Sequence, residues 1–306
     1  MTGIVVKSTG SWYNVMEKES RQIYNCRLRG KFKMHGLKTT NPIAVGDVVD
    51  FNISKDNTGV IDNIHERKNY IIRKATKLSK RSHIISANID QAVLIVTLAN
   101  PRTTTGFIDR FLATAEAYSI PACLVFNKSD MYNEAEIVKY KELRNLYEEL
   151  GYMCLLTSAA NGFNIDKFVS LLTNKISLLA GHSGVGKSTL INVIEPSLNL
   201  KTQNISSYHN KGKHTTTFAE MFELSKGGFI IDTPGIKEFG LSDVESWEIS
   251  HYFPEMRKLF NKCRFDNCTH DHEPGCKVVE ELKKGNISKS RYASYISMLY
   301  DEDNRS

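Results

Sequence analysis

The sequence predicts a multidomain protein with an N-terminal β-barrel, a central α/β domain and a C-terminal, mainly helical, metal-binding module. Three observations support this. Short apolar runs separated by turn residues occupy residues 1–70, apolar strands then alternate with helical segments, and three cysteines and a histidine crowd near the C-terminus. We therefore expect domains at residues 1–70, 71–240 and 241–306, with residues 71–90 as a linker at the start of the second domain.

The composition is that of a soluble globular protein. The chain has 306 residues, of which 41% are hydrophobic and 24% charged, enough for two or three domains with sizeable cores. The apolar run at residues 92–98, among the longest, is far shorter than the ~20 residues of a membrane helix. Residues 1–10 lack the apolar core of a signal peptide. We therefore expect a cytoplasmic protein and disfavour the membrane and secreted classes.

Positive charge is clustered along the chain. The 40 Lys and Arg exceed the 34 Asp and Glu by six, yet residues 18–38 hold seven basic residues and one acid, and residues 68–83 hold six basic residues and no acid. Such clusters attract the phosphate backbone of nucleic acids. A solvated basic surface explains either stretch alone equally well. The candidate RNA contacts in the first stretch are Arg27, Arg29, Lys31 and Lys33.

Five short strands are expected in the first domain. Their apolar runs are separated by Gly, Asn and Pro, which favour turns. The expected strands are residues 3–7, 12–15, 24–29, 47–51 and 59–62. Five strands in so short a segment fit a small barrel, for which an OB-type barrel is the first choice and an SH3-like barrel the alternative.

The second domain alternates strands and helices, which indicates an α/β sheet. The continuous apolar run 92–98 is typical of a parallel strand covered on both faces. Further strands are expected at residues 122–126, 152–156 and 177–180, helices at 107–118, 134–150, 165–172 and 188–194, and a hairpin from 218–224 and 229–231. Past residue 240 the pattern becomes helical and polar.

The segment Gly181–Ser188 matches G-x-x-x-x-G-K-[ST] and lies between an expected strand and an expected helix. That context predicts a phosphate-binding loop. Glycines let backbone N–H groups surround a phosphate, and the helix N-terminus adds positive potential. We expect Lys187 to reach the β- and γ-phosphates and the Ser188 hydroxyl to ligate Mg²⁺. Asp232 ends another expected strand and can hold Mg²⁺ through water, while Gly235 can approach a γ-phosphate.

A guanine-binding motif is expected after the strand 122–126. The segment Asn127–Asp130 resembles the N-K-x-D motif of GTPases, because the Asp130 carboxylate can accept two N–H donors that guanine offers and adenine lacks. The segment Thr157–Ala159 resembles the loop that completes the base pocket. Both precede the phosphate loop, whereas in ordinary Ras-like GTPases they follow it. The motif order therefore predicts a circularly permuted P-loop GTPase domain, whose motifs can still meet at the carboxyl ends of one sheet.

A metal site is predicted near the C-terminus. The pattern C-x₄-C-x-H-x₅-C supplies three thiolates and one imidazole, an accepted tetrahedral set for structural zinc. The expected ligands are Cys263, Cys268, His270 and Cys276, and His272 could replace His270. The remaining cysteines are scattered, and Cys123 and Cys154 lie in apolar runs typical of buried strands.

Together these motifs resemble the bacterial ribosome small-subunit-dependent GTPase A (RsgA) family. The resemblance also includes residues 212–217 and 87–91 and covers nearly the whole chain. It implies a monomeric GTPase that binds the 30S subunit and 16S rRNA late in maturation, hydrolyses GTP faster when bound there, and then leaves. It also implies Mg²⁺ with GTP and one structural Zn²⁺ per chain.

The resemblance assigns roles residue by residue. Mg²⁺ would lie among Ser188, Asp232 and one of Thr215–Thr217, for which Thr216 is our choice. Ile236 stands where many Ras-like GTPases place a water-orienting glutamine, and His214 is our candidate for that role beside Lys187. The expected GTP-binding residues are Asn127, Lys128, Ser129, Asp130, Ser158, Ala159, Gly181, His182, Ser183, Gly184, Val185, Gly186, Lys187, Ser188, Thr189 and Gly235.

Two other functions compete with this one. An RNA-binding module could use its nucleotide site only to sense state, with negligible turnover. An ATP-dependent P-loop kinase would also carry residues 181–188, but the guanine motif at residues 127–130 argues against it.

Overall fold

The computed structural model of the chain describes residues 1–29, 42–54, 56–73, 83–200, 219–232 and 244–300. It divides into two compact units, each assembled from segments that are distant in the sequence. Unit 1 comprises Met1–Ala92, Ile165–Ala180 and Lys187–Glu238, and unit 2 comprises Val93–Asn164, Gly181–Gly186 and Phe239–Ser306. The domain boundaries expected near residues 70 and 240 stay a prediction. In the part of the chain described, no helix has the length and apolar character that a membrane span requires.

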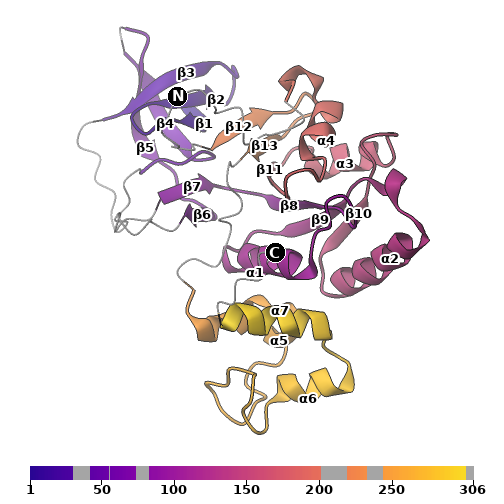
Figure 1. Cartoon of the computed structure of the whole chain (residues 1–306). Helices are drawn as coiled ribbons and strands as arrows, with labels where there is room; N and C mark the ends of the chain where they lie inside the picture. The colour runs from indigo at the N-terminus through magenta and orange to yellow at the C-terminus, as the bar shows by residue number, and fades with distance from the viewer. Residues whose placement is uncertain (30–41, 55, 74–82, 201–218, 233–243, 301–306) are drawn as a thin grey trace, which may run out of the picture. The chain divides into compact units, whose positions relative to one another are not determined.

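The N-terminal part of unit 1 is a closed five-stranded barrel. β1 pairs with both β2 and β4, β2 with β3, and β4 with β5, all antiparallel, while β3 and β5 are parallel. This closure confirms the OB-type barrel (Figure 1). Alternate residues of the strands point inward and form the core, which includes Val5, Tyr13, Val15, Val49, Phe51 and Ile61. The strands are β1 (Thr2–Ser8), β2 (Tyr13–Glu17), β3 (Ile23–Leu28), β4 (Val48–Ile53) and β5 (Gly59–Ile64).

The segment expected to be a linker contains part of a small sheet. β6 (Tyr70–Arg73) and β7 (His83–Ala87) pair antiparallel, so part of the segment expected to be a linker forms strands. The reason is burial: Ile84 and Ala87 pack against Ala44 and the partly buried Tyr70. The basic residues on which the linker expectation rested, at positions 74–82, lie outside the described part of the chain.

The rest of unit 1, as far as the structure describes it, carries three strands, two α-helices and the short 3₁₀ helix η2 (Pro196–Leu198). β11 (Ile176–Ala180) is parallel to β13 (Phe229–Asp232), and β13 forms the expected hairpin with β12 (Glu220–Glu223). β12 also pairs antiparallel with β1 of the barrel, and Lys7 and Glu220 form an ion pair of 3.0 Å at that junction. The α-helices are α3 (Ile165–Leu172) and α4 (Lys187–Ile194).

Unit 2 contains the other half of the α/β fold. β8 (Gln91–Val96), of which all but two residues belong to this unit, lies beside β9 (Ala122–Phe126), and β9 is parallel to β10 (Met153–Leu156). β8 is buried throughout, as its apolar run predicts. Helix α1 (Thr105–Ala117) is capped by Thr104, and α2 (Glu134–Glu149) begins with a capping box of Asn133 and Glu136. Cys123 and Cys154 are buried in β9 and β10, as expected.

The C-terminal part of unit 2 is helical, as the sequence predicts. The helices are η5 (Ser246–Tyr252, a 3₁₀ helix), α5 (Pro254–Arg257), α6 (Lys277–Lys284) and α7 (Lys289–Leu299). Phe253, Met256, Val278 and Tyr295 are buried in a core that includes Ala113 of α1. The helical module is therefore packed on α1, and α7 runs beside α1 in Figure 1.

Candidate functional site

The phosphate loop connects β11 to α4, as its motif predicts. Gly181 and Gly186 have backbone φ angles of +149° and +88°, which residues other than glycine rarely adopt. A Cβ at Gly181 would lie 2.5 Å from the carbonyl oxygen of Ile95, and a Cβ at Gly186 would lie 2.4 Å from Nδ2 of Asn127. Both positions therefore require glycine, because the loop backbone passes directly over β8 and the guanine motif.

Asn127 joins the guanine motif to the phosphate loop. Its side chain is 1% exposed. Nδ2 donates to the carbonyl oxygen of Val185 at 2.9 Å, and Oδ1 accepts from the hydroxyl of Thr157 and the backbone N–H of Ala159, both at 3.3 Å. One amide thus connects the guanine motif, the phosphate loop and the loop at Thr157–Ala159.

The other residues of the guanine motif are less buried, with Lys128 and Ser129 partly buried and Asp130 exposed. Lys128 has a left-handed backbone (φ +63°), and its Nζ donates to the carbonyl oxygen of Asn100 at 2.6 Å. Asp130 is exposed, and its Oδ1 accepts a hydrogen bond from the hydroxyl of buried Ser158. This bond fixes the orientation of the Asp130 carboxylate, which remains accessible to the two N–H donors of a guanine ring.

Several predicted site residues lie outside the described part of the chain. They are Lys31, Lys33, His214, Thr215, Thr216, Thr217, Gly235 and Ile236. Asp232 is the last residue of β13, and Ser188 is buried in the first turn of α4. The roles of all these residues stay predictions.

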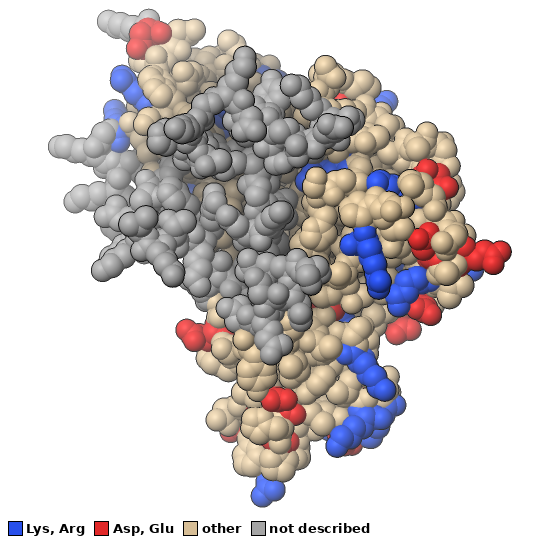
Figure 2. Space-filling view, in the orientation of Figure 1, with Lys and Arg blue, Asp and Glu red and all other residues tan. Residues whose placement is uncertain are grey.

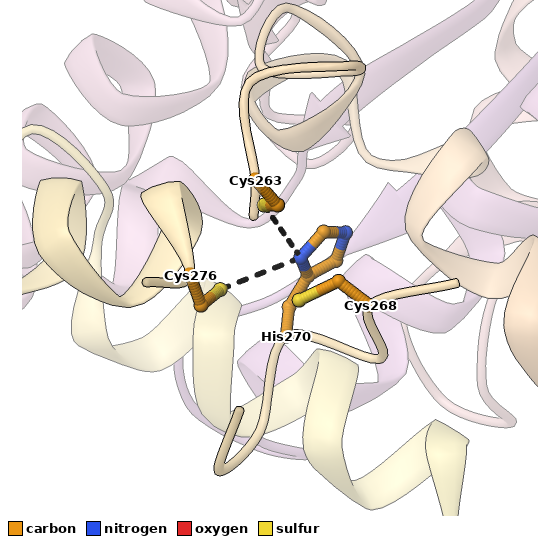
Figure 3. Close-up of side chains that lie close together, drawn as sticks. All are labelled: Cys263, Cys268, His270 and Cys276. Atoms are coloured by element: carbon orange, nitrogen blue, oxygen red, sulfur yellow. Dashed lines mark hydrogen bonds between the residues drawn. The ribbon is translucent and has the colours of Figure 1, made fainter. Parts of the chain in front are cut away.

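Three cysteines and a histidine meet in the C-terminal module. The donor atoms of Cys263, Cys268, His270 and Cys276 all lie within 4.8 Å of one another (Figure 3). Nδ1 of His270 is 3.6 Å from Sγ of Cys263 and 3.5 Å from Sγ of Cys276. Zinc–sulfur bonds of about 2.3 Å and zinc–nitrogen bonds of about 2.0 Å, at a tetrahedral angle, place such atoms roughly 3.5 Å apart. The four residues therefore fit a single zinc ion, and each of the four predicted ligands belongs to the cluster.

His272, the alternative ligand, lies apart from this cluster. Its side chain is 80% exposed and pairs with Asp271 at 3.1 Å. Burial raises the pKa of the Cys268 thiol to about 12, so a bound cation is needed to hold it as a thiolate. The backbone N–H groups of Lys277 and Val279 donate to the sulfurs of Cys263 and Cys276, at 3.3 and 3.5 Å, and would stabilise thiolates there.

Hydrogen bonds hold the loop that carries His270. Glu273 accepts from the N–H and hydroxyl of Thr269, both at 2.6 Å, and from the N–H of Asp271. Burial opposes ionisation of Glu273, but these bonds outweigh it and lower the pKa of the carboxyl to about 2. On α7, the hydroxyl of Tyr292 donates to the carbonyl oxygen of His270 at 2.8 Å. The metal loop is thereby attached to the last helix.

A buried ion-pair network joins α1 to the C-terminal helices, and no sequence pattern pointed to it. Arg291 donates to Asp109 at 2.9 Å and to both oxygens of Glu255 at 2.7 and 3.1 Å. The side chains of Arg291 and Asp109 are 0% exposed. Burial disfavours the charged guanidinium, yet the carboxylates of Asp109 and Glu255 outweigh it and raise the pKa of Arg291. Asp109 and Arg291 are 182 positions apart, so only the fold brings them together.

Basic side chains are exposed in both units. In unit 1, the predicted RNA contacts Arg27 and Arg29 lie at the barrel surface, and Arg29 pairs with Asp62 at 2.9 Å while its side chain stays 74% exposed. In unit 2, Figure 2 shows Lys and Arg side chains gathered where Figure 1 places α6. That helix carries Lys277, Lys283 and Lys284.

Two family models match the chain. One, described as the RsgA GTPase, matches residues 64–242, and one described as the RsgA N-terminal domain matches residues 2–61. The small ribosomal subunit biogenesis GTPase RsgA of Flavobacterium psychrophilum is 53% identical over 306 residues, covering 99% of this chain and 94% of the relative. The protein named small ribosomal subunit biogenesis GTPase RsgA 2 of Bacteroides thetaiotaomicron is 53% identical over 303 residues, covering 99% of this chain and 97% of the relative.

Two solved structures are similar over the whole chain. YjeQ from Thermotoga maritima superposes with a TM-score of 0.80 at 36% identity, covering 100% of this chain and 99% of that one. YloQ, described as a circularly permuted GTPase, superposes with a TM-score of 0.76 at 27% identity, covering 100% and 96%. These similarities confirm the permuted GTPase fold that the motif order predicts.

Proposed function

This chain belongs to the RsgA GTPase family, and from that premise we propose that it hydrolyses GTP during late maturation of the 30S ribosomal subunit. It is a GTPase by family. We further propose that the bound subunit and its rRNA stimulate hydrolysis, and that the protein is then released. The names of its relatives, small ribosomal subunit biogenesis GTPases, support the 30S subunit as partner and the cytoplasm as location.

The main support for a single nucleotide site is the hydrogen bond from Asn127 to Val185. Because the buried amide holds the guanine motif against the phosphate loop at 2.9 Å, one bound nucleotide can contact both. The proposed division of labour follows. Asp130 and Lys128 select guanine, with Ser158 and Ala159 behind the base, and backbone N–H groups of residues 181–189 bind the phosphates.

For hydrolysis, we propose that Lys187 neutralises charge that develops on the β- and γ-phosphates. Ser188, Thr216 and Asp232 would hold Mg²⁺, which screens the phosphate charge when it is bound. Ile236 offers no polar atom to orient the attacking water, so His214 is the candidate for that role. Zinc at the Cys₃His cluster would be structural, because four protein ligands leave no open position.

The test is hydrolysis of GTP and ATP by the whole chain, with and without purified 30S subunits. We expect hydrolysis of GTP alone, and faster turnover with subunits present. Lys187→Ala should abolish turnover, whereas Lys226→Ala, an exposed lysine in the turn between β12 and β13, should leave it unchanged. Equal rates with and without subunits would contradict the stimulated reaction, and negligible turnover under both conditions would favour a module that only senses the nucleotide.

A further inference from the structure

Helix α1 contacts the phosphate loop at its first turn. The ring of Phe107 lies over the ring of His182, the second residue of that loop, with 3.9 Å between centroids and 33° between planes. Just before the helix, Pro101 faces Gly184, where a Cβ would lie 3.3 Å from the proline ring. The start of α1 and the segment before it are therefore packed on the loop that holds the phosphates.

The same helix is fixed to the C-terminal module. Asp109, two positions after Phe107, accepts hydrogen bonds from Arg291 and Ser294 of α7, at 2.9 and 2.6 Å, and from Tyr147 of α2 at 2.9 Å. All four side chains are buried. A buried charge that loses its partner is strongly disfavoured, so α1 and α7 are held at one relative position.

A second attachment lies at the other end of α1. Glu116 accepts from Arg257, at the end of α5, at 2.9 Å and from Tyr152 at 3.1 Å. Helix α7 also holds the metal loop, the loop that carries His270. The hydroxyls of Tyr292 and Tyr295 on α7 donate to the carbonyl oxygens of His270 and Thr269. A continuous series of contacts thus runs from the metal loop through α7 and α1 to the phosphate loop.

We propose that α1 couples the C-terminal metal module to the phosphate loop, with Phe107 as a positioning residue that acts through His182. The inference rests on the proposed function, since it concerns how the same nucleotide site is controlled. A displacement of the module by its partner shifts α1 as a rigid element, and the Phe107 ring then shifts the loop. By linkage, nucleotide bound at the loop changes the partner affinity of the module by the same factor.

The first test changes the ring contact and measures GTP affinity, kcat and KM. Phe107→Leu keeps an apolar side chain but removes the stacked ring, and should weaken GTP binding about threefold to tenfold, the range typical of one aromatic pair. Phe107→Tyr keeps an aromatic ring and should bind GTP with the affinity of the unaltered chain. Phe265→Leu, an exposed ring of the module that lies beside Arg264, is the matched control. Equal GTP affinity for Phe107→Leu and the unaltered chain would overturn the positioning role.

The second test measures coupling with a mild change in the module. Ser294→Ala removes one hydrogen bond to Asp109 and should change GTP affinity about twofold or more when Phe107 is present, but not in the Phe107→Leu background. The control is Ser170→Ala on α3, where the serine hydroxyl donates to the carbonyl oxygen of Asp166 in the preceding turn of the same helix. Additive effects would overturn the coupling alone. Absence of GTP binding in the unaltered chain would overturn the proposed function itself.

Discussion

The side-chain amide of Asn127 donates to the backbone carbonyl of Val185 across 58 positions of sequence. Because Asn127 also accepts two hydrogen bonds in a buried position, its loss leaves several polar groups unpaired. We predict that Asn127→Ala lowers the free energy of unfolding by about 1–3 kcal/mol and weakens GTP binding roughly tenfold. Denaturant unfolding and titration with fluorescent GTP measure both. Asn286→Ala, which removes an exposed bond to Glu281, is the control, and equal effects of the two variants would contradict the role of Asn127.

The exposed carboxylate of Asp130 is predicted to choose the base. Asp130→Asn places an amide opposite the N–H donors of guanine, whereas the carbonyl of xanthine suits that amide better. We expect preference to move from GTP toward xanthosine triphosphate, measured by competition for hydrolysis. Asp166→Asn on α3 should keep the original preference. The assignment of the base pocket is wrong if Asp130→Asn retains full GTP affinity and gains none for the xanthine nucleotide.

The Cys₃His cluster predicts one zinc per chain. Cys268→Ser and His270→Ala should lose the metal, and unfolding should be confined to the C-terminal module, because ordering these buried ligands depends on the ion. His272→Ala should keep the metal, since that side chain is exposed. Elemental analysis of protein purified without chelator gives the stoichiometry. Zinc-free protein, or loss of zinc from His272→Ala alone, would contradict the ligand set.

The basic residues of the barrel are predicted to contact rRNA. Replacing Arg27, Arg29, Lys31 and Lys33 together by Ala should weaken 30S binding and flatten its dependence on salt, since each phosphate contact contributes a slope of roughly 0.9 on a duplex. Basal GTP hydrolysis should remain unchanged, because none of the four belongs to the nucleotide motifs. The measurement is 30S affinity across a salt series. An unaltered slope would mean that this surface is only solvated.

The elements that the sequence predicts are those with local signals. Apolar runs predict β8, β9 and β11, because a buried strand needs consecutive apolar residues. The spacing of the glycines predicts the loop at residues 181–186, because phosphate binding needs glycines at fixed positions. The cysteine spacing likewise located the metal cluster. A local pattern also identified Asn127, although as part of a base-recognition motif rather than as the residue that joins three loops.

The remaining features depend on contacts between distant residues. Arg291 would be expected at the surface, and only Asp109 and Glu255 make its burial possible. No sequence motif or residue spacing predicts the contact between the rings of Phe107 and His182. Strand β7 was missed because Ile84 finds its apolar partners in Ala44 and Tyr70, which lie far from it in sequence.

Strand β12 lies between its hairpin partner β13 and barrel strand β1. Without the barrel, the backbone of β12 at Glu220 would lose its partner Lys7, and open sheet edges recruit strands from other molecules. The ion pairs of Lys7 with Glu220 and of Arg21 with Glu223 would also be lost. We therefore predict that the barrel protects this edge from self-association, so that a fragment that starts after residue 70 aggregates at concentrations at which the whole chain stays dispersed.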